Sequence, residues 1–340
     1  MGVGKVIPEY VCNLLGSLNQ CLMRGDLPSE ALIEANVAAF DTLSPDDIVL
    51  ADIYIRKFLY RCSEIVHFEN ERGQTLDLLR RMPALAQVLT FHRDGYVREA
   101  ALKVLTIVPR SPFMLAALII RLNDWVEPVR VAAIKCVQPL CAQVDPDVAV
   151  AAGMSLCGRW HEWTRWTSAQ ALCMDHLFAR PAVNERLAIR FVSQLDGPLA
   201  TTLRYFLCAP VLDTALPMLA AQARQASVRA VALEVLLCGQ AKWKKGRRRE
   251  WINKIYNISR SIPVIESRAI SVPVIRNDLI SMGLCDRSSI VRRVILMALT
   301  KNWQDFPDLD SVMPALLQDR SPTVRRWAGY LVRQRAALPH

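Results

Sequence analysis

The segment DWVEPVRVAAIKCVQPL, residues 124–140, carries the pattern from which the fold of this chain is predicted. Counted from Val129, apolar or small residues stand at offsets 0, 3, 4, 7, 8 and 11. Such spacing places them on one side of a helix. The first five offsets recur at four other places, so the chain contains five such stripes, which begin at Val97, Val129, Val228, Val291 and Val324.

The stripes recur at nearly regular intervals. Val97 and Val129 are 32 residues apart, Val291 and Val324 are 33 apart, and the two longer gaps are close to two and three such periods. An arginine follows the first residue of every stripe, and an aspartate precedes four of them, at Asp94, Asp124, Asp286 and Asp319. A helical pair that recurs every 30 to 35 residues indicates an α-solenoid, in which each unit buries its stripe against its neighbours.

The motif Asp-x-x-x-x-Val-Arg-x-x-Ala, found from Asp124 to Ala133 and with small changes from Asp286 and Asp319, resembles the HEAT repeat. The resemblance covers about residues 80–335, in seven or eight units. It implies an all-α fold, an α-α superhelix of stacked antiparallel helix pairs. In that family the aspartate lies in the turn of a pair and the arginine on the second helix, and together they form a ladder of polar contacts.

Two parts of the chain depart from the repeat. Residues 1–80 are interpreted as an N-terminal helical capping region, with a helix start at Ser44 and an apolar stripe from Ile55. Residues 81–340 are expected to form the repeat array, with a basic interruption at 239–271. There the sequence SRSIP, residues 259–263, stands where a helix of the repeat is expected.

Composition excludes several classes of protein. The 340 residues are 52% hydrophobic and 22% charged, which excludes a disordered chain, and thirteen glycines disfavour a fold built of tight turns. The longest apolar runs are well short of a membrane span, and the N-terminus lacks the pattern of a signal peptide. We therefore expect a cytoplasmic protein that does not bind membranes.

The net charge of +10 is unevenly distributed. Residues 242–260 hold eight basic side chains and one acidic one, whereas residues 1–90 are acidic overall. A helix is expected to begin near Arg247, and if the run is only a solvated loop, Trp251, Ile252 and Ile255 are expected to pack inward. The run is either a solvated loop, a site for phosphate groups, or a site for an acidic protein surface. Its candidate binding residues are Lys242, Lys244, Lys245, Arg247, Arg248, Arg249 and Lys254.

Other binding residues are predicted on the second helices of the repeat units. The arginines coupled to an aspartate are interpreted as structural. Arg293, Arg326 and Lys103 have no obvious repeat aspartate and are better candidates for exposed contacts on the concave face. Among Trp160, Trp163 and Trp166, Trp163 is a candidate anchor in the concave groove, although plain core packing is the favoured interpretation of these tryptophans.

No pattern in the sequence requires a metal, a cofactor or catalysis. Cys157 with His161, and Cys173 with His176, have helical spacing that suits either a zinc site or a core of reduced thiols, and we predict no metal. Phosphate-binding glycine loops, GxSxG and HExxH are absent. HEAT-like DNA glycosylases share a tryptophan followed four residues later by a catalytic aspartate, which no tryptophan here has.

The sequence thus predicts a non-enzymatic binding scaffold of HEAT-repeat type. Its predicted partner is a protein with an acidic surface, bound through the concave face and the basic segment, so that the chain acts as an adaptor, an assembly factor or a neutraliser of a toxin or enzyme. The alternative is a nucleic-acid-binding HEAT-like protein, related to the DNA glycosylases. The sequence names neither partner.

Overall fold

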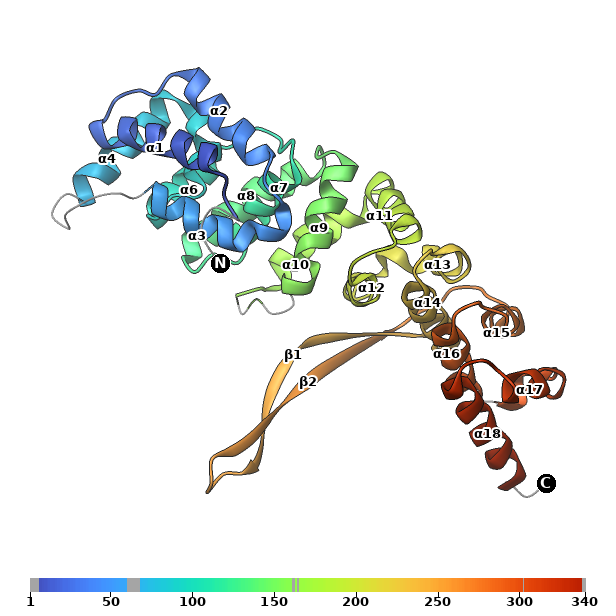
Figure 1. Ribbon diagram of the computed structural model, residues 1–340. Helices are drawn as coiled ribbons and strands as arrows, with labels where there is room; N and C mark the ends of the chain where they lie inside the picture. The colour runs from blue at the N-terminus through green and yellow to red at the C-terminus, as the bar shows by residue number, and fades with distance from the viewer. Residues whose placement is uncertain (1–5, 60–67, 161–162, 164, 302, 338–340) are drawn as a thin grey trace. The chain divides into compact units, whose positions relative to one another are not determined.

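The computed structural model describes residues 6–59, 68–160, 163, 165–301 and 303–337, and the fold is all-α (Figure 1). A two-stranded antiparallel sheet is the only sheet in this described part. The chain forms two compact units, Met1–Val183 and Asn184–His340. None of the helices in the described ranges is both long and apolar enough to cross a lipid bilayer.

The first unit contains ten helices within its described residues. Their bounds are α1 Glu9–Arg24, α2 Glu30–Asp41, α3 Ile48–Phe58, α4 Phe68–Arg81, α5 Ala86–Leu89, α6 Gly95–Val104, α7 Pro112–Arg121, α8 Glu127–Cys141, α9 Pro146–Trp160 and α10 Ser168–Ala179. Helices α4, α6, α8 and α10 pack in series, each against the next. Helix α7 packs against α2, α3 and α9, so a second layer of helices backs this row.

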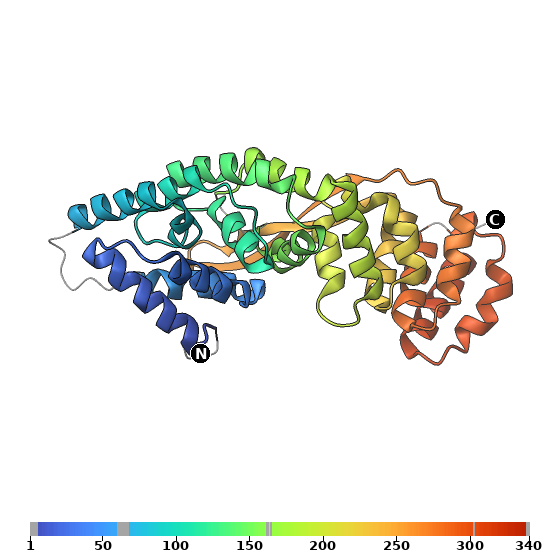
Figure 2. The same ribbon diagram turned by 90° about the horizontal axis from the view of Figure 1, so that it is seen from above.

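The boundary between the units falls within α11, Pro181–Ser193. The elements that follow are α12 Leu199–Phe206, α13 Leu216–Gln222, α14 Ala226–Cys238, β1 Gln240–Asn253, β2 Ile258–Ala269, α15 Arg276–Leu284, α16 Ser289–Leu299, α17 Leu309–Leu317 and α18 Pro322–Ala337. Helices α12, α14, α16 and α18 again pack in series. Figure 2 shows the orange and red helices of this unit lying side by side.

The five predicted stripes lie on α6, α8, α14, α16 and α18. On α8 and α14 every stripe residue is buried, which confirms the predicted spacing. Val104 and Val332 are exceptions, because both are exposed. At Val104 the reason is that α6 ends there, and the chain turns away before another helical turn is completed.

The N-terminal region is helical, as predicted, throughout its described residues. Ser44 accepts a hydrogen bond from the backbone N–H of Asp46 at 3.3 Å and caps the short turn that precedes α3. Ile55 is fully buried on α3, which ends at Phe58. The continuation of that stripe, at Cys62 and Val66, lies outside the described residues.

The repeat arginines and aspartates form one recurring arrangement, which confirms that these arginines are structural. Three of the five arginines reach the aspartate in the turn before the next helix of their row, in the pairs Arg98–Asp124, Arg229–Asp286 and Arg292–Asp319, each at 2.7 Å. Arg72 on α4 pairs in the same way with Asp94 at 2.6 Å. The aspartates also accept the backbone N–H two residues on, which fixes the turn before the next helix, and Asp94 is itself the N-cap of α6.

Each repeat arginine also binds the turn that precedes its own helix. Arg98, Arg229 and Arg292 donate to the backbone carbonyl six residues earlier at 2.7–2.9 Å, and so do Arg130 and Arg325. One guanidinium therefore ties its own turn to the next one. Five donors in a planar fork make arginine suited to this double role.

His92 lies in the turn that Arg98 binds, and it makes the stability of the protein depend on pH. Its Nδ1 accepts a hydrogen bond from the backbone N–H of Asp94 at 3.0 Å, so the ring must be neutral at that atom. Burial, reinforced by the nearby charges of Arg98 and Arg56, lowers the pKa of His92 to about 4 from its usual value of 6.5, although the charge of Asp94 opposes this shift. In the unfolded chain the same ring is protonated below pH 6.5.

Stability should therefore fall as pH decreases from 6.5 towards 4, because the unfolded state binds the additional proton. We expect a loss of about 2 kcal/mol in the free energy of unfolding by pH 5, measured by urea denaturation. Replacing His92 by asparagine should flatten this dependence. If the free energy of unfolding of the variant falls with pH as steeply as that of the native protein, the pH dependence does not come from His92.

Candidate functional site

The basic segment forms a long β-hairpin, here called the ribbon, that consists of β1, β2 and the turn between them. It follows α14, which ends at Gly239 with φ of 63°, and Ile270 N–H donates to Gly239 O at 2.9 Å to close its base. Arg268 fastens that base to the second unit through Asp213 at 2.5 Å and through the carbonyls of Leu207 and Ala209. From this base the strands extend away from α14 and α16 (Figure 1).

The helix expected near Arg247 is therefore absent, and the inward packing expected of Trp251, Ile252 and Ile255 is wrong. All three side chains are exposed, Ile255 to 90%. The physical reason lies in the partner strand, because residues 258–269 pair with β1 in an antiparallel ladder. Pro263 in the middle of that segment also disfavours a helix.

A β-bulge at Lys245 determines which basic residues share a face. Lys244 pairs with Ile265 and Gly246 pairs with Val264, so Lys245 is an extra residue on β1. Because side chains alternate along a strand, an uninterrupted ladder would place the lysines before this point and the arginines after it on opposite faces. The bulge brings Lys242, Lys244, Arg247 and Arg249 onto one face, here called the basic face.

No acidic residue of β2 lies opposite the basic face. The residues of β2 on this face are Ser259, Ser261, Pro263, Ile265 and Ser267. Arg247 Nε donates to Ser261 Oγ at 2.7 Å, and Arg249 Nε donates to Ser259 Oγ at 2.7 Å. The serines therefore orient both guanidinium groups without neutralising their charge. Arg249 also lies 4.1 Å from the centre of the Trp251 ring.

The opposite face of the ribbon has paired charges. Lys245 forms an ion pair with Glu266, and Arg260 forms one with Glu250 at 2.5 Å. Arg248 lies on this face as well, opposite Ile262. Arg247 and Arg249 thus bind serines on the basic face, whereas Lys245 and Arg260 bind carboxylates, although both faces are rich in basic side chains. Lys254, the last of the predicted basic residues, is exposed in the turn at the end of the ribbon.

The remaining predicted contact residues lie elsewhere. Arg293 on α16 is exposed and lines a groove of about 400 Å³ between α12, α14 and α16, together with Lys301. Arg326 is exposed on α18. Trp163 lies in the connection between α9 and α10, so the expectation that it projects from a second helix is wrong. Its ring packs edge-on against Trp166, with centroids 5.1 Å apart.

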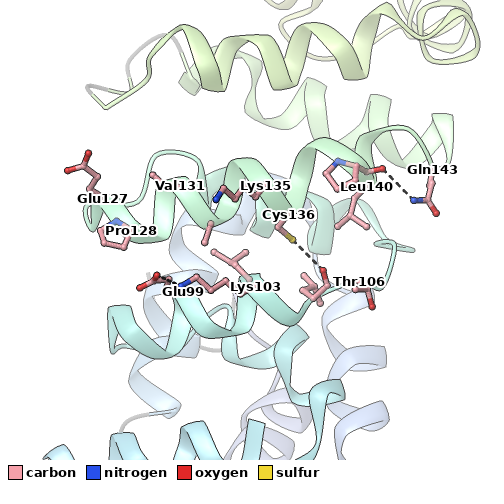
Figure 3. A pocket seen from close by; sticks show the side chains of 14 residues that line it. Glu99, Lys103, Thr106, Glu127, Pro128, Val131, Lys135, Cys136, Leu140 and Gln143 are labelled. Carbon is pink, nitrogen blue, oxygen red and sulfur yellow. Dashed lines mark hydrogen bonds and ion pairs between the residues drawn. The ribbon is translucent and has the colours of Figure 1, made fainter. Parts of the chain in front are cut away.

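Figure 3 shows a larger groove in the first unit, about 720 Å³ in volume, between α6 and α8. Its walls include apolar side chains such as Val131 and Leu140. Lys103, predicted as an exposed contact, is paired here with Glu99 at 2.6 Å. Glu127 and Lys135 also line the groove, so acidic and basic groups balance. This groove therefore has no excess of charge for a polyanion.

The cysteines provide no metal site within the described residues. His161 lies outside them, and no group of three metal-ligating side chains occurs among the residues that are described. Cys157 and Cys173 are buried, whereas Cys238 and Cys285 are exposed. Burial raises the pKa of Cys136 to about 11 and that of Cys141 to about 12, so both are thiols near neutral pH.

Neither the protein-family models nor the curated proteins contain a match to this chain. The geometry of the ribbon is therefore what supports a function for this chain. Its basic residues are evident from the sequence, but the strand pairing that gives them a common face is not. The sequence signal of a second strand is the set of β-branched residues Ile258, Ile262, Val264 and Ile265, preceded by the turn-forming residues Asn253 and Asn257.

Proposed function

We propose that this chain is a HEAT-type helical-repeat protein that binds double-stranded nucleic acid through the basic face of its ribbon. The observation that carries the proposal is the bulge at Lys245, which gathers four cationic side chains on a face without opposing carboxylates. Two of them are guanidinium groups oriented by serines. Arginine in a fixed orientation suits the bidentate recognition of phosphate.

The shape of the ribbon supports a duplex as the partner. Two strands lie about 4.8 Å apart, and an isolated two-stranded ribbon with its side chains fits a groove about 12 Å wide, as in the major groove of B-DNA. Cations at alternate positions of a strand are about 7 Å apart along its length. Regularly repeated phosphates complement such a row, and Trp251 adds a surface for stacking.

The helical array supports the HEAT-type assignment. In each unit, successive second helices pack in series, and arginine–aspartate pairs connect consecutive turns. This arrangement suits a solenoid in which each unit is stabilised by its neighbours. We propose that the array holds the ribbon in place through Arg268 and Ala241, which are anchored or buried at its base.

A salt titration with a fluorescently labelled duplex tests the proposal. The affinity measured by anisotropy should fall linearly with salt on logarithmic axes, with a slope of roughly −3 to −4 for four phosphate contacts. This corresponds to a loss of about a hundredfold between 50 and 200 mM salt. Absence of duplex binding at low salt would refute it.

Competition by poly-L-glutamate distinguishes a duplex partner from the acidic protein partner that the sequence predicts. It offers carboxylates without the shape of a groove, and it should compete with the duplex only weakly at equal charge concentration. Competition equal to that of unlabelled duplex would favour the acidic protein partner and contradict the nucleic-acid assignment.

A further inference from the structure

The end of the ribbon is apolar although it is surrounded by solvent. Ile255 and Tyr256 in the turn are exposed to 90% and 75%, and Ile252 and Ile258 beside them are exposed as well. A cluster of large exposed apolar side chains indicates a surface that contacts a partner. We call these four residues the apolar tip.

The backbone of the turn holds the apolar tip in a defined shape. Asn253 Oδ1 accepts hydrogen bonds from the backbone N–H groups of Ile255 at 2.9 Å and Tyr256 at 3.2 Å. Asn257 adopts a left-handed conformation, with φ of 54°, and its N–H donates to Lys254 O at 3.3 Å. Asparagine tolerates this conformation better than most residues. The turn therefore presents Ile255 and Tyr256 at the extremity of the ribbon.

We propose that the apolar tip inserts between adjacent base pairs when the ribbon binds a duplex, so that it unstacks one base step and kinks the nucleic acid. The inference rests on the proposed function. Isoleucine is one of the residues that act as such wedges, and the cost of unstacking, a few kcal/mol per step, is offset by the contacts that bent DNA permits.

The distribution of charge favours a duplex over a lipid bilayer as the partner of the tip. From Lys242 to Arg249 the basic face extends about 20 Å along the strands. A membrane surface contacted by the tip would meet only the last 5–10 Å of the ribbon. A duplex lying along the ribbon contacts the whole basic face and the tip together.

The experiment uses the full chain and a short duplex in which 2-aminopurine replaces adenine at its TA steps, because these steps unstack easily. Binding is followed by anisotropy, unstacking by 2-aminopurine fluorescence, and bending by energy transfer between end labels. The native protein should increase the 2-aminopurine fluorescence severalfold and shorten the distance between the ends.

The tip variant combines Ile255→Ser with Tyr256→Ser, and the matched control is Ile275→Ser, an exposed isoleucine outside the ribbon. The tip variant should bind within about threefold of the native affinity but lose the fluorescence increase and the bend, since its phosphate contacts are intact. The control should behave as the native protein does.

Four outcomes would overturn the inference. Native binding without unstacking would refute the wedge alone and leave the proposed function standing, as would a tip variant that still unstacks the duplex. Absence of duplex binding would refute both. Tip-dependent binding to vesicles of anionic phospholipid, without binding to the duplex, would assign the tip to membranes instead.

Discussion

Replacing Asp124 by asparagine is expected to lower the free energy of unfolding of the first unit by about 3–5 kcal/mol. The side chains of Asp124 and Arg98 are 1% and 0% exposed, and Asp124 accepts two hydrogen bonds from Arg98, at 2.7 and 3.0 Å. Asparagine leaves the Arg98 charge buried without its partner. Burial raises the pKa of Asp124, but hydrogen bonds and charges from Arg98 and Arg121 outweigh this and hold it below its usual value.

Asp310→Asn is the control, because Asp310 pairs with an arginine too, Arg335 at 2.5 Å, but its side chain is 79% exposed. Solvent screens that pair, so this variant should unfold at nearly the native urea concentration. Urea denaturation of both variants measures the difference. Equal urea midpoints for the two variants would show that burial does not determine how much these ion pairs stabilise the protein.

The second large effect is expected for the basic face. Replacing Lys242, Arg247 and Arg249 together by glutamine should weaken duplex binding about 100-fold at low salt, at roughly 1 kcal/mol for each lost phosphate contact. Glutamine keeps the length of the side chain and a hydrogen-bond donor while it removes the charge. Anisotropy titrations provide the affinity, and thermal denaturation checks that the ribbon and the array stay folded.

The opposite face offers a control with the same change in net charge. Lys245, Arg248 and Arg260 replaced by glutamine remove three cations, two of which are paired with Glu266 and Glu250. Long-range attraction decreases equally in both variants, so a difference in affinity reports direct contact. We expect a loss below tenfold for this control. Equal losses for the two faces would show that only net charge attracts the duplex.

The helical part of this structure could be predicted from sequence because its determinants are local. The offsets from Val129 to Leu140 follow the period of a helix, and Asp286 and Asp319 each bind a backbone N–H in the turn before the helix that follows. The residue types that form the arginine–aspartate pairs were also predictable, since the same two types recur at each period. The contact of Arg121 with Asp52 was not, because 69 residues separate them and neither belongs to the repeat motif.

Only the composition of the ribbon, and not its structure, could be predicted from the sequence. Its charge was evident, but strand pairing is a contact between segments, and the bulge at Lys245 changes the face on which Arg247 and Arg249 lie. The period of two in β1 therefore shifts by one residue at Lys245. Trp163 was misplaced for a different reason, because the helix expected to carry it begins only at Ser168.

The salt dependence of duplex binding, measured in parallel on the native protein and on the basic-face variant, tests the central claim most directly. If Lys242, Arg247 and Arg249 each contact a phosphate, the logarithmic slope of the variant should be less steep than the native slope by about 2.7. Two parallel lines would mean that these residues release no counterions on binding, and the ribbon would then not be the surface that contacts the duplex.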